Sequence, residues 1–122
     1  AERIQFVQSD LLESIHFDGE GIVANLPYIG TDKFNFVEDL VRRHEPNVAL
    51  FGGNNGLQIY ERLFQQIRAH IKISSNLKFL CFEFGFLQRE TLESILNNFF
   101  TQDSVFFHQD LSGIDRACSI LL

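Results

Sequence analysis

Residues 57–71 read LQIYERLFQQIRAHI, and residues 77–84, which follow shortly after, read LKFLCFEF. In the first segment the apolar side chains recur at helical spacing and share one face. The second segment is a short apolar run that stops before Gly85, which is typical of a buried strand. A helix followed by a buried strand is a building unit of α/β proteins, so this stretch predicts an α/β fold. The residues of the helical face are Leu57, Tyr60, Phe64, Ile67 and Ile71.

The remaining segments continue this alternation. Residues 3–8 alternate apolar and polar side chains, which predicts a strand. Residues 11–15 predict a short turn of helix. Gly21–Ala24 is apolar throughout, as expected for a parallel strand that is covered on both faces. The apolar residues of segment 31–44 have helical spacing, which predicts a helix, and a flap is the alternative. A second helix is predicted after Gly85, and residues 105–107 and 117–122 predict an antiparallel pair. We therefore expect one domain over residues 1–122, with a mostly parallel sheet and a C-terminal antiparallel hairpin. The second helix carries Leu92, Ile95, Leu96, Phe99 and Phe100.

Composition excludes several classes of protein. The net charge is −6 and no basic stripe is present, which argues against direct DNA binding. We find no signal peptide and no apolar stretch of membrane length, so we predict a cytoplasmic protein without membrane contact. Cys81 and Cys118 lie in apolar runs and are predicted to be buried thiols, with a disulfide as the alternative. The chain starts on Ala1 and contains no Met, so we expect it to be a piece of something longer.

The stretch with the most chemical information is Asn25-Leu26-Pro27-Tyr28, which follows the predicted strand Gly21–Ala24. The side-chain carbonyl of Asn25 can accept one N–H of a planar –NH2 group, and a backbone carbonyl beside Pro27 can accept the other. The fixed φ of Pro27 limits how far that carbonyl moves, and Tyr28 supplies a flat wall. The alternative is that these are ordinary turn residues.

Other polar residues offer weaker signals. Asp10 ends a predicted strand, where ligands gather in open α/β sheets, although a helix cap explains it equally well. Glu83 lies in an apolar strand and is interpreted as a buried acceptor of backbone N–H groups, with a catalytic base as the alternative. The four histidines are isolated from one another, so no metal site is expected.

The motifs, taken in order, resemble those of the peptide chain release factor glutamine methyltransferases over essentially the whole chain. They are Ser9-Asp10, Asn25-x-Pro27-Tyr28-Ile29, Glu45-Pro46, Ala49-Leu50-x-Gly52-Gly53-x-x-Gly56-Leu57-x-x-Tyr60, Glu83-x-Gly85-x-x-Gln88 and Asp110-x-x-Gly113-x-Asp115-Arg116. The resemblance implies a class I, Rossmann-like methyltransferase that uses S-adenosylmethionine. Its partner would be a release factor, whose Gly-Gly-Gln loop carries the glutamine to be methylated at N(5).

The resemblance also implies roles for particular residues. Asn25, Leu26 and the backbone at Pro27 would hold the substrate amide, and Tyr28 would shape the pocket; Asn25, Pro27 and Tyr28 would form the catalytic set. Asp10 and Leu11 would lie against the adenine of the cofactor, and Asn25 would also approach its methionine portion.

The chain departs from this family in two respects. Leu26 stands where the family usually has Pro, and Asn-Leu-Pro-Tyr is typical of ribosomal RNA adenine dimethyltransferases, which present an adenine amino group in the same way. The acidic balance and the Gly-Gly-x-x-Gly-Leu block favour the glutamine substrate over this alternative.

The second departure is an absence from the sequence: no Gly-x-Gly-x-Gly precedes Asp10. We therefore expect the C-terminal part of a catalytic domain, inactive by itself, with its cofactor loop upstream. We also expect an exposed strand edge at Gly21–Ala24, which invites dimerisation or pairing with residues 3–9. A non-catalytic binding or assembly fragment is the third hypothesis.

Overall fold

The computed structural model of the chain describes residues 3–16, 18–28, 56–72 and 76–122. Helices and strands alternate along these residues much as the sequence predicts. The predictions for residues 31–44 and most of the glycine-rich block at 52–56 lie outside the described residues. The elements are β1 (Gly21–Ala24), α3 (Gln58–Ile71), β2 (Phe79–Glu83), α4 (Arg89–Leu96), the 3-10 turn η2 (Gln102–Ser104), β3 (Val105–Gln109) and β4 (Asp115–Leu121).

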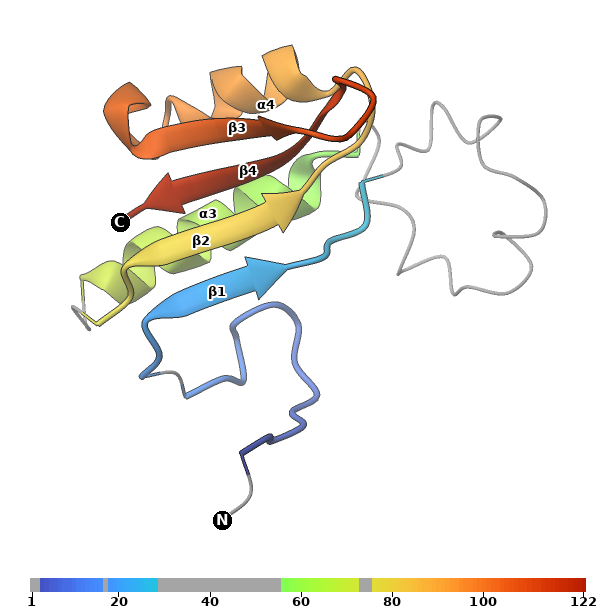
Figure 1. The fold of residues 1–122 in the computed structure, drawn as a ribbon. Coiled ribbons are helices and arrows are strands. Elements are labelled where there is room, and N and C mark those ends of the chain that lie inside the picture. Colours follow the sequence, from blue (N-terminus) through green and yellow to red (C-terminus); the bar gives the residue numbers. More distant parts are fainter. Residues whose placement is uncertain (1–2, 17, 29–55, 73–75) are drawn as a thin grey trace.

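The strands form one sheet in the order β1-β2-β4-β3. β1 pairs with β2 in parallel, whereas β4 is antiparallel to both β2 and β3. Three strands therefore point the same way and only β4 opposes them, as Figure 1 shows. This arrangement confirms the predicted α/β sheet with its C-terminal hairpin. It also confirms that β1 forms an edge of the sheet among the described strands.

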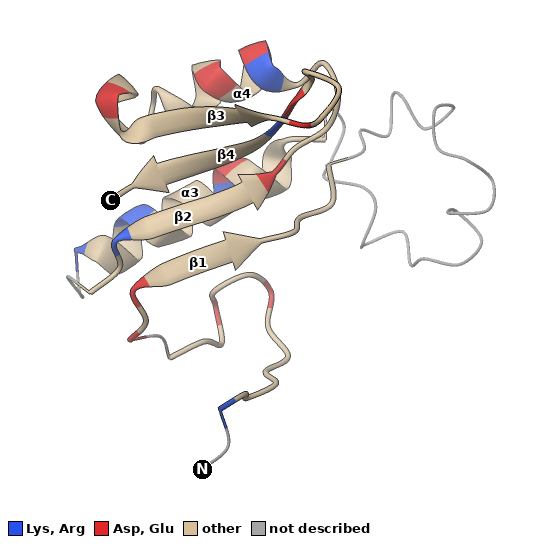
Figure 2. Cartoon of the chain, viewed as in Figure 1, with Lys and Arg blue, Asp and Glu red and all other residues tan. Residues whose placement is uncertain are grey.

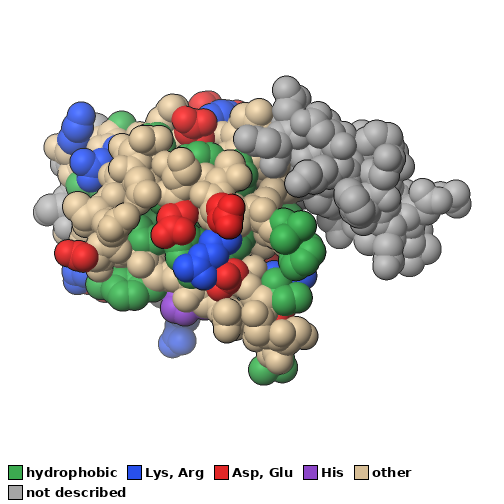
Figure 3. Space-filling model, turned by 90° about the horizontal axis from the view of Figure 1, so that it is seen from above, with side chains coloured by type: hydrophobic (Ala, Val, Ile, Leu, Met, Phe, Trp, Pro, Cys, Tyr) green, Lys and Arg blue, Asp and Glu red, His purple; other side chains and the backbone are tan. Residues whose placement is uncertain are grey.

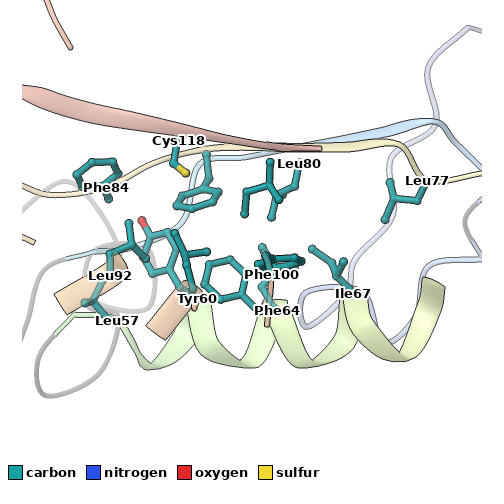
Figure 4. Packing of buried hydrophobic residues seen from close by; sticks show 14 residues of the cluster. Leu57, Tyr60, Phe64, Ile67, Leu77, Leu80, Phe84, Leu92, Phe100 and Cys118 are labelled. Carbon is teal, nitrogen blue, oxygen red and sulfur yellow. The ribbon is translucent and has the colours of Figure 1, made fainter. Parts of the chain in front are cut away.

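Helices α3 and α4 cover the same face of the sheet (Figure 1). The apolar stripe of α3 explains this position, because a helix with one apolar face is stable only when that face is buried. The ring centroid of Phe64 on α3 lies 5.6 Å from that of Phe82 on β2 and 5.6 Å from that of Phe100 after α4. These rings lie in the layer between α3 and the sheet, whose packing Figure 4 shows.

The opposite face of the sheet, called the open face below, carries exposed apolar side chains. The exposed fraction is 83% for Val23 on β1, 40% for Phe79 on β2, 46% for Phe106 on β3 and 60% for Leu121 on β4. Side chains alternate between the two faces of a strand, so each strand presents one set to the helices and another to the open face. The prediction that β1 is covered on both faces is therefore wrong for the described part of the chain.

The predicted strand at residues 3–8 is also absent. Residues 4–9 have no regular secondary structure, and Ile4 and Phe6 are 70% and 94% exposed. The apolar alternation is present, but a strand needs a hydrogen-bonding partner, and residues 3–9 do not pair with β1. Residues 11–14 form a hydrogen-bonded turn, with the Glu13 N–H donating to the Asp10 carbonyl at 3.2 Å, rather than a turn of helix.

Candidate functional site

The predicted tetrapeptide lies at the carboxyl end of β1, beside the carboxyl end of β2. Ala24, the last residue of β1, is in register with Phe82 on β2. Asn25 follows at once and is exposed, and its side-chain amide makes no hydrogen bond with another described residue. The carboxyl ends of parallel strands are the usual ligand position in open α/β sheets. The most polar side chain of the tetrapeptide is therefore accessible at the edge where a substrate would be expected.

Tyr60 of α3 contacts the backbone at the carboxyl ends of β1 and β2. Its side chain is fully buried, and its hydroxyl donates a hydrogen bond to the Glu83 carbonyl at 2.6 Å. The Leu26 carbonyl lies 3.5 Å from the same hydroxyl. Burial raises the pKa of Tyr60 above its ordinary value, so the hydroxyl keeps its proton. Figure 4 shows the Tyr60 oxygen directed from α3 toward the sheet.

This geometry leaves the Leu26 carbonyl able to accept a further hydrogen bond. A tyrosine hydroxyl has a single proton to donate, and the 2.6 Å contact with Glu83 is the shorter of its two. No other described residue donates to the Leu26 carbonyl, so within this part of the chain it can accept another N–H. Asn25 and Leu26 together offer two neighbouring acceptor oxygens, one from a side chain and one from the backbone, which is the arrangement that a planar –NH2 group requires.

Hydrogen bonds through the Gln88 side chain connect the last residue of the tetrapeptide to the loop after β2. The Gln88 Nε2 donates to the Tyr28 carbonyl at 2.7 Å, and the Gln88 Oε1 accepts the Gly85 N–H at 2.7 Å. A side chain at Gly85 would not fit, because its Cβ would lie 2.8 Å from Gln88 Oε1 and 2.9 Å from Tyr28 Cδ2. Tyr28 and Leu26 also pack against the buried core. The loop and the tetrapeptide therefore form one packed unit.

Asp10 is held by α3, and Leu11 packs against the core. The Asp10 carboxylate forms an ion pair with Arg62 of α3, with 2.8 Å between Oδ2 and Nη2, and its carbonyl begins the turn at residues 10–13. The next residue, Leu11, has a φ of 53° and packs partly against the core. A positive φ at a residue other than glycine is uncommon and often marks a functional segment. Among the described residues, no hydrogen bond or ion pair joins Asp10 to the tetrapeptide.

Curated relatives match nearly the whole chain. The release factor glutamine methyltransferase of Lactococcus lactis subsp. lactis is 34% identical over 117 residues, which are 96% of this chain and 42% of that protein. Its counterpart in Bacillus subtilis is 32% identical over 122 residues, 98% of this chain and 41% of the relative. A bifunctional methyltransferase of Rickettsia felis is 34% identical over 119 residues, 94% of this chain and 21% of the relative. No protein-family model matches the chain.

The chain is related to the release factor glutamine methyltransferases. It spans about 40% of the length of the first two relatives and matches their C-terminal part. The resemblance inferred from the motifs is thereby confirmed, including the expectation that the chain corresponds to a C-terminal piece. The carboxyl-end site described above therefore lies within the segment that this chain shares with those methyltransferases.

Two residues of the site were not assigned a role from sequence. The sequence predicts Tyr60 on the core face of a helix, and both Tyr60 and Gln88 belong to the family motifs. The signal for Gln88 was nevertheless present, since a Gln three residues after a strand-ending Gly lies at the same sheet edge as Asn25. Tyr60 also belongs to a motif of the family, but its position on the core face of a helix makes it look like any other core residue.

The remaining sequence predictions have mixed outcomes. Glu83 is exposed, so its interpretation as a buried acceptor is wrong, and its backbone carbonyl is the group that is engaged. Cys81 and Cys118 are free thiols, which contradicts the disulfide alternative. In the described part of the chain, no three His, Cys, Asp or Glu side chains gather to hold a metal ion. None of the described helices is both long and apolar enough to span a bilayer.

Proposed function

We propose that this chain is part of an enzyme that methylates a glutamine side-chain amide in a peptide chain release factor, with S-adenosylmethionine as the methyl donor. The observation that carries the proposal is the exposed amide of Asn25, which makes no hydrogen bond with another described residue and lies next to the Leu26 carbonyl. The names of the relatives support the substrate class. A cytoplasmic location fits this role, since release factors act in translation.

The site residues would act by positioning. An amide nitrogen is a poor nucleophile, because its lone pair is delocalised into the carbonyl. Hydrogen bonds from its two N–H groups to Asn25 Oδ1 and the Leu26 carbonyl would fix the orientation of the nitrogen. Well-oriented reactants can gain about 7–11 kcal/mol from such placement. The product proton can leave after transfer, so no general base is required, in keeping with the exposed position of Glu83.

The cofactor would supply an electrophilic methyl group on a sulfonium. The residues of this chain fit only part of such a ligand. The amide of Asn25 makes no hydrogen bond within the described part of the chain, and Asp10 is exposed at the turn before β1, although its Oδ2 is paired with Arg62. No Gly-x-Gly-x-Gly lies before Asp10 in the sequence. We propose that Asp10 and Leu11 contact the adenine, that Asn25 approaches the methionine portion, and that the glycine-rich loop is supplied by upstream chain.

The open face of the sheet supports this partial-domain proposal. Its exposed apolar side chains are Val23, Phe79, Phe106 and Leu121, and sheets with parallel strands are normally covered on both faces. The match to only part of the relatives agrees with this arrangement. We therefore expect the 122-residue chain alone to bind S-adenosylmethionine weakly or not at all. Calorimetry that finds submillimolar affinity for this chain would contradict the proposal.

Leu26 at the second motif position favours a second candidate, methylation of an adenine amino group in ribosomal RNA. The charges of the described residues argue against it. Four basic side chains are engaged by acidic ones, so they offer little attraction to phosphate. Figure 2 shows acidic residues distributed among the basic ones, and Figure 3 shows a basic group surrounded by acidic ones on the side of α4. The pairs are Arg62–Asp10, Lys78–Glu20, Arg89–Asp115 and Arg116–Asp110.

The assay that separates the candidates is methyl transfer by the full-length protein to a purified release factor and, in parallel, to ribosomal RNA. We expect label only in the release factor. Asn25→Ala should abolish transfer while leaving the thermal unfolding temperature unchanged, because Asn25 is exposed. Asn98→Ala is the matched control, since Asn98 is also exposed but lies after α4. Retained activity in Asn25→Ala would remove Asn25 from its assigned role.

A further inference from the structure

Gln88 connects two segments that are 60 residues apart in sequence. One end of its side-chain amide accepts the Gly85 N–H, and the other end donates to the Tyr28 carbonyl, both at 2.7 Å. We call these two hydrogen bonds the Gln88 bridge. The bridge joins the loop after β2 to the last residue of the tetrapeptide. It therefore couples the site to the centre of the sheet.

At neutral pH, a glutamine side chain meets the needs of this position. The bridge needs a donor and an acceptor on one planar group, which an amide provides. An ionised Glu has the same length but no proton to donate, and it would place a negative charge against the Tyr28 carbonyl. Asn is one methylene shorter, and Met has a similar volume but cannot donate. These differences make the bridge testable by single substitutions.

The surrounding backbone is shaped to hold the bridge. Gly85 leaves room for the Gln88 amide and the Tyr28 ring, which a Cβ would strike. Leu87, immediately before Gln88, has a φ of 65°, a conformation that costs a residue other than glycine about 1–3 kcal/mol. Such strain persists only where neighbouring contacts impose it. Gln88 is also the N-cap of α4, but its side chain makes no capping hydrogen bond to the helix.

The bridge acts next to the acceptor carbonyl of Leu26. Tyr60 lies against the Leu26 carbonyl, and Gln88 binds the Tyr28 carbonyl. Between these two contacts stands Pro27, whose ring fixes its φ. The backbone that presents Asn25 and Leu26 is thus restrained on both sides of the proline. Loss of the bridge would free the Tyr28 side, and the position of the Leu26 carbonyl would become less defined.

We propose that Gln88 is a positioning residue for methyl transfer, acting through Tyr28 rather than by touching the substrate. This inference rests on the proposed function. Displacement of reacting groups by about 1 Å can cost about 100-fold in rate. Gln88→Met in the full-length protein should therefore lower kcat by about 10–100-fold. KM for the release factor should change less, because the proposed role of Gln88 does not involve touching the substrate.

The matched control is Gln65→Met, since Gln65 is exposed on α3. It should leave kcat and KM unchanged. Thermal unfolding of both variants gives the amount of folded protein. A kcat for Gln88→Met within twofold of the parent value, per folded molecule, would overturn the proposal. Activity lost only in proportion to folded protein would also overturn it and would leave Gln88 a structural role.

Gln88→Glu gives a second readout that a purely structural role would not produce. A protonated carboxyl group has one donor and one acceptor, so it can restore both hydrogen bonds of the bridge. The activity of Gln88→Glu relative to the parent should therefore rise as the pH falls from 8 to 6, because partial burial raises the pKa of a carboxyl group. A ratio that does not change with pH would contradict the proposal.

A test without turnover separates this inference from the proposed function. If the parent protein fails to methylate release factor, the proposed function fails, but the position of Asn25 can still be measured. The side-chain amide resonances of Asn25 in a nitrogen-15 NMR spectrum should shift or broaden in Gln88→Met and stay unchanged in Gln65→Met. Unchanged Asn25 resonances in Gln88→Met would overturn the inference whatever the activity.

Discussion

The two faces of the sheet are built from the same four strands but differ in almost every physical respect. On the helix-covered face, Leu80, Phe82 and Ile120 are at most 2% exposed. On the open face, Val23 is 83% and Leu121 is 60% exposed. Composition alone does not explain this difference, because the open face carries exposed apolar side chains alongside the polar Glu83, His108 and Ser119. It follows from where α3 and α4 pack, so apolar side chains stabilise this chain only on one side.

The strongest test of this difference is the same substitution on each face. Leu80→Ala should lower the free energy of unfolding by about 2–5 kcal/mol, because it leaves a cavity in the buried layer. Leu121→Ala, on the open face, should change it by no more than about 0.5 kcal/mol. Urea denaturation of both variants provides the comparison. Equal losses would show that the open face is buried in solution.

The next test uses the two tyrosines of the chain. Tyr60→Phe leaves the Glu83 carbonyl without its donor in the buried layer, which should cost about 1–3 kcal/mol. Tyr28→Phe should cost less than about 0.5 kcal/mol, because the Tyr28 hydroxyl makes no hydrogen bond with another described residue. Denaturation curves of the two variants decide between them. A loss in Tyr28→Phe as large as that in Tyr60→Phe would contradict the assignment of the Tyr60 hydrogen bond.

The reactivities of the Cys81 and Cys118 thiols also test the difference between the two faces of the sheet. Burial raises the pKa of Cys118 to about 12, so at pH 8 very little of it is thiolate, the reactive form. Cys81 is less buried and belongs to the open face. Iodoacetamide should therefore modify Cys81 at least about tenfold faster, which corresponds to about 1.4 kcal/mol. Mass spectrometry of timed digests measures both rates, and equal rates would show that the helix-covered layer opens readily.

The smallest effect is expected at the β3–β4 hairpin, which belongs to neither face. Hydrogen bonds from the Ile114 and Ser112 N–H groups and the nearby Arg116 lower the pKa of Asp110. Because the pKa of Asp110 is lower in the folded state, its ionised carboxylate stabilises the fold fully above the unfolded pKa of about 3.9. This contribution to the free energy of unfolding is lost as the pH falls through the folded pKa. Stability between pH 4 and 2 should fall less in Asp110→Asn than in the parent. Parallel pH curves would contradict this role.

The sequence predicted most of the elements and part of the site. Helix α3, the strands β1 and β2 and the final hairpin follow from the spacing of apolar side chains and from glycines next to apolar runs. Helix α4 was predicted to continue to Phe100 but ends at Leu96, where Phe99 and Phe100 pack in a turn. The prediction of a strand at residues 3–8 was wrong, because this segment pairs with no strand of the described sheet. Sequence patterns record the preference of a segment but not whether a neighbour is present to satisfy it.

The residues of the site divide in the same way. Sequence alone predicts a site at Asn25, Pro27 and Tyr28, because their chemistry is local: a side-chain amide, a fixed φ and a flat ring. Only the tertiary structure showed that Tyr60 and Gln88 engage the backbone around them. Those contacts join residues 23 and 60 positions apart. Local chemistry can be read from neighbouring residues, whereas hydrogen bonds between distant segments exist only once the sheet has brought its strand ends together.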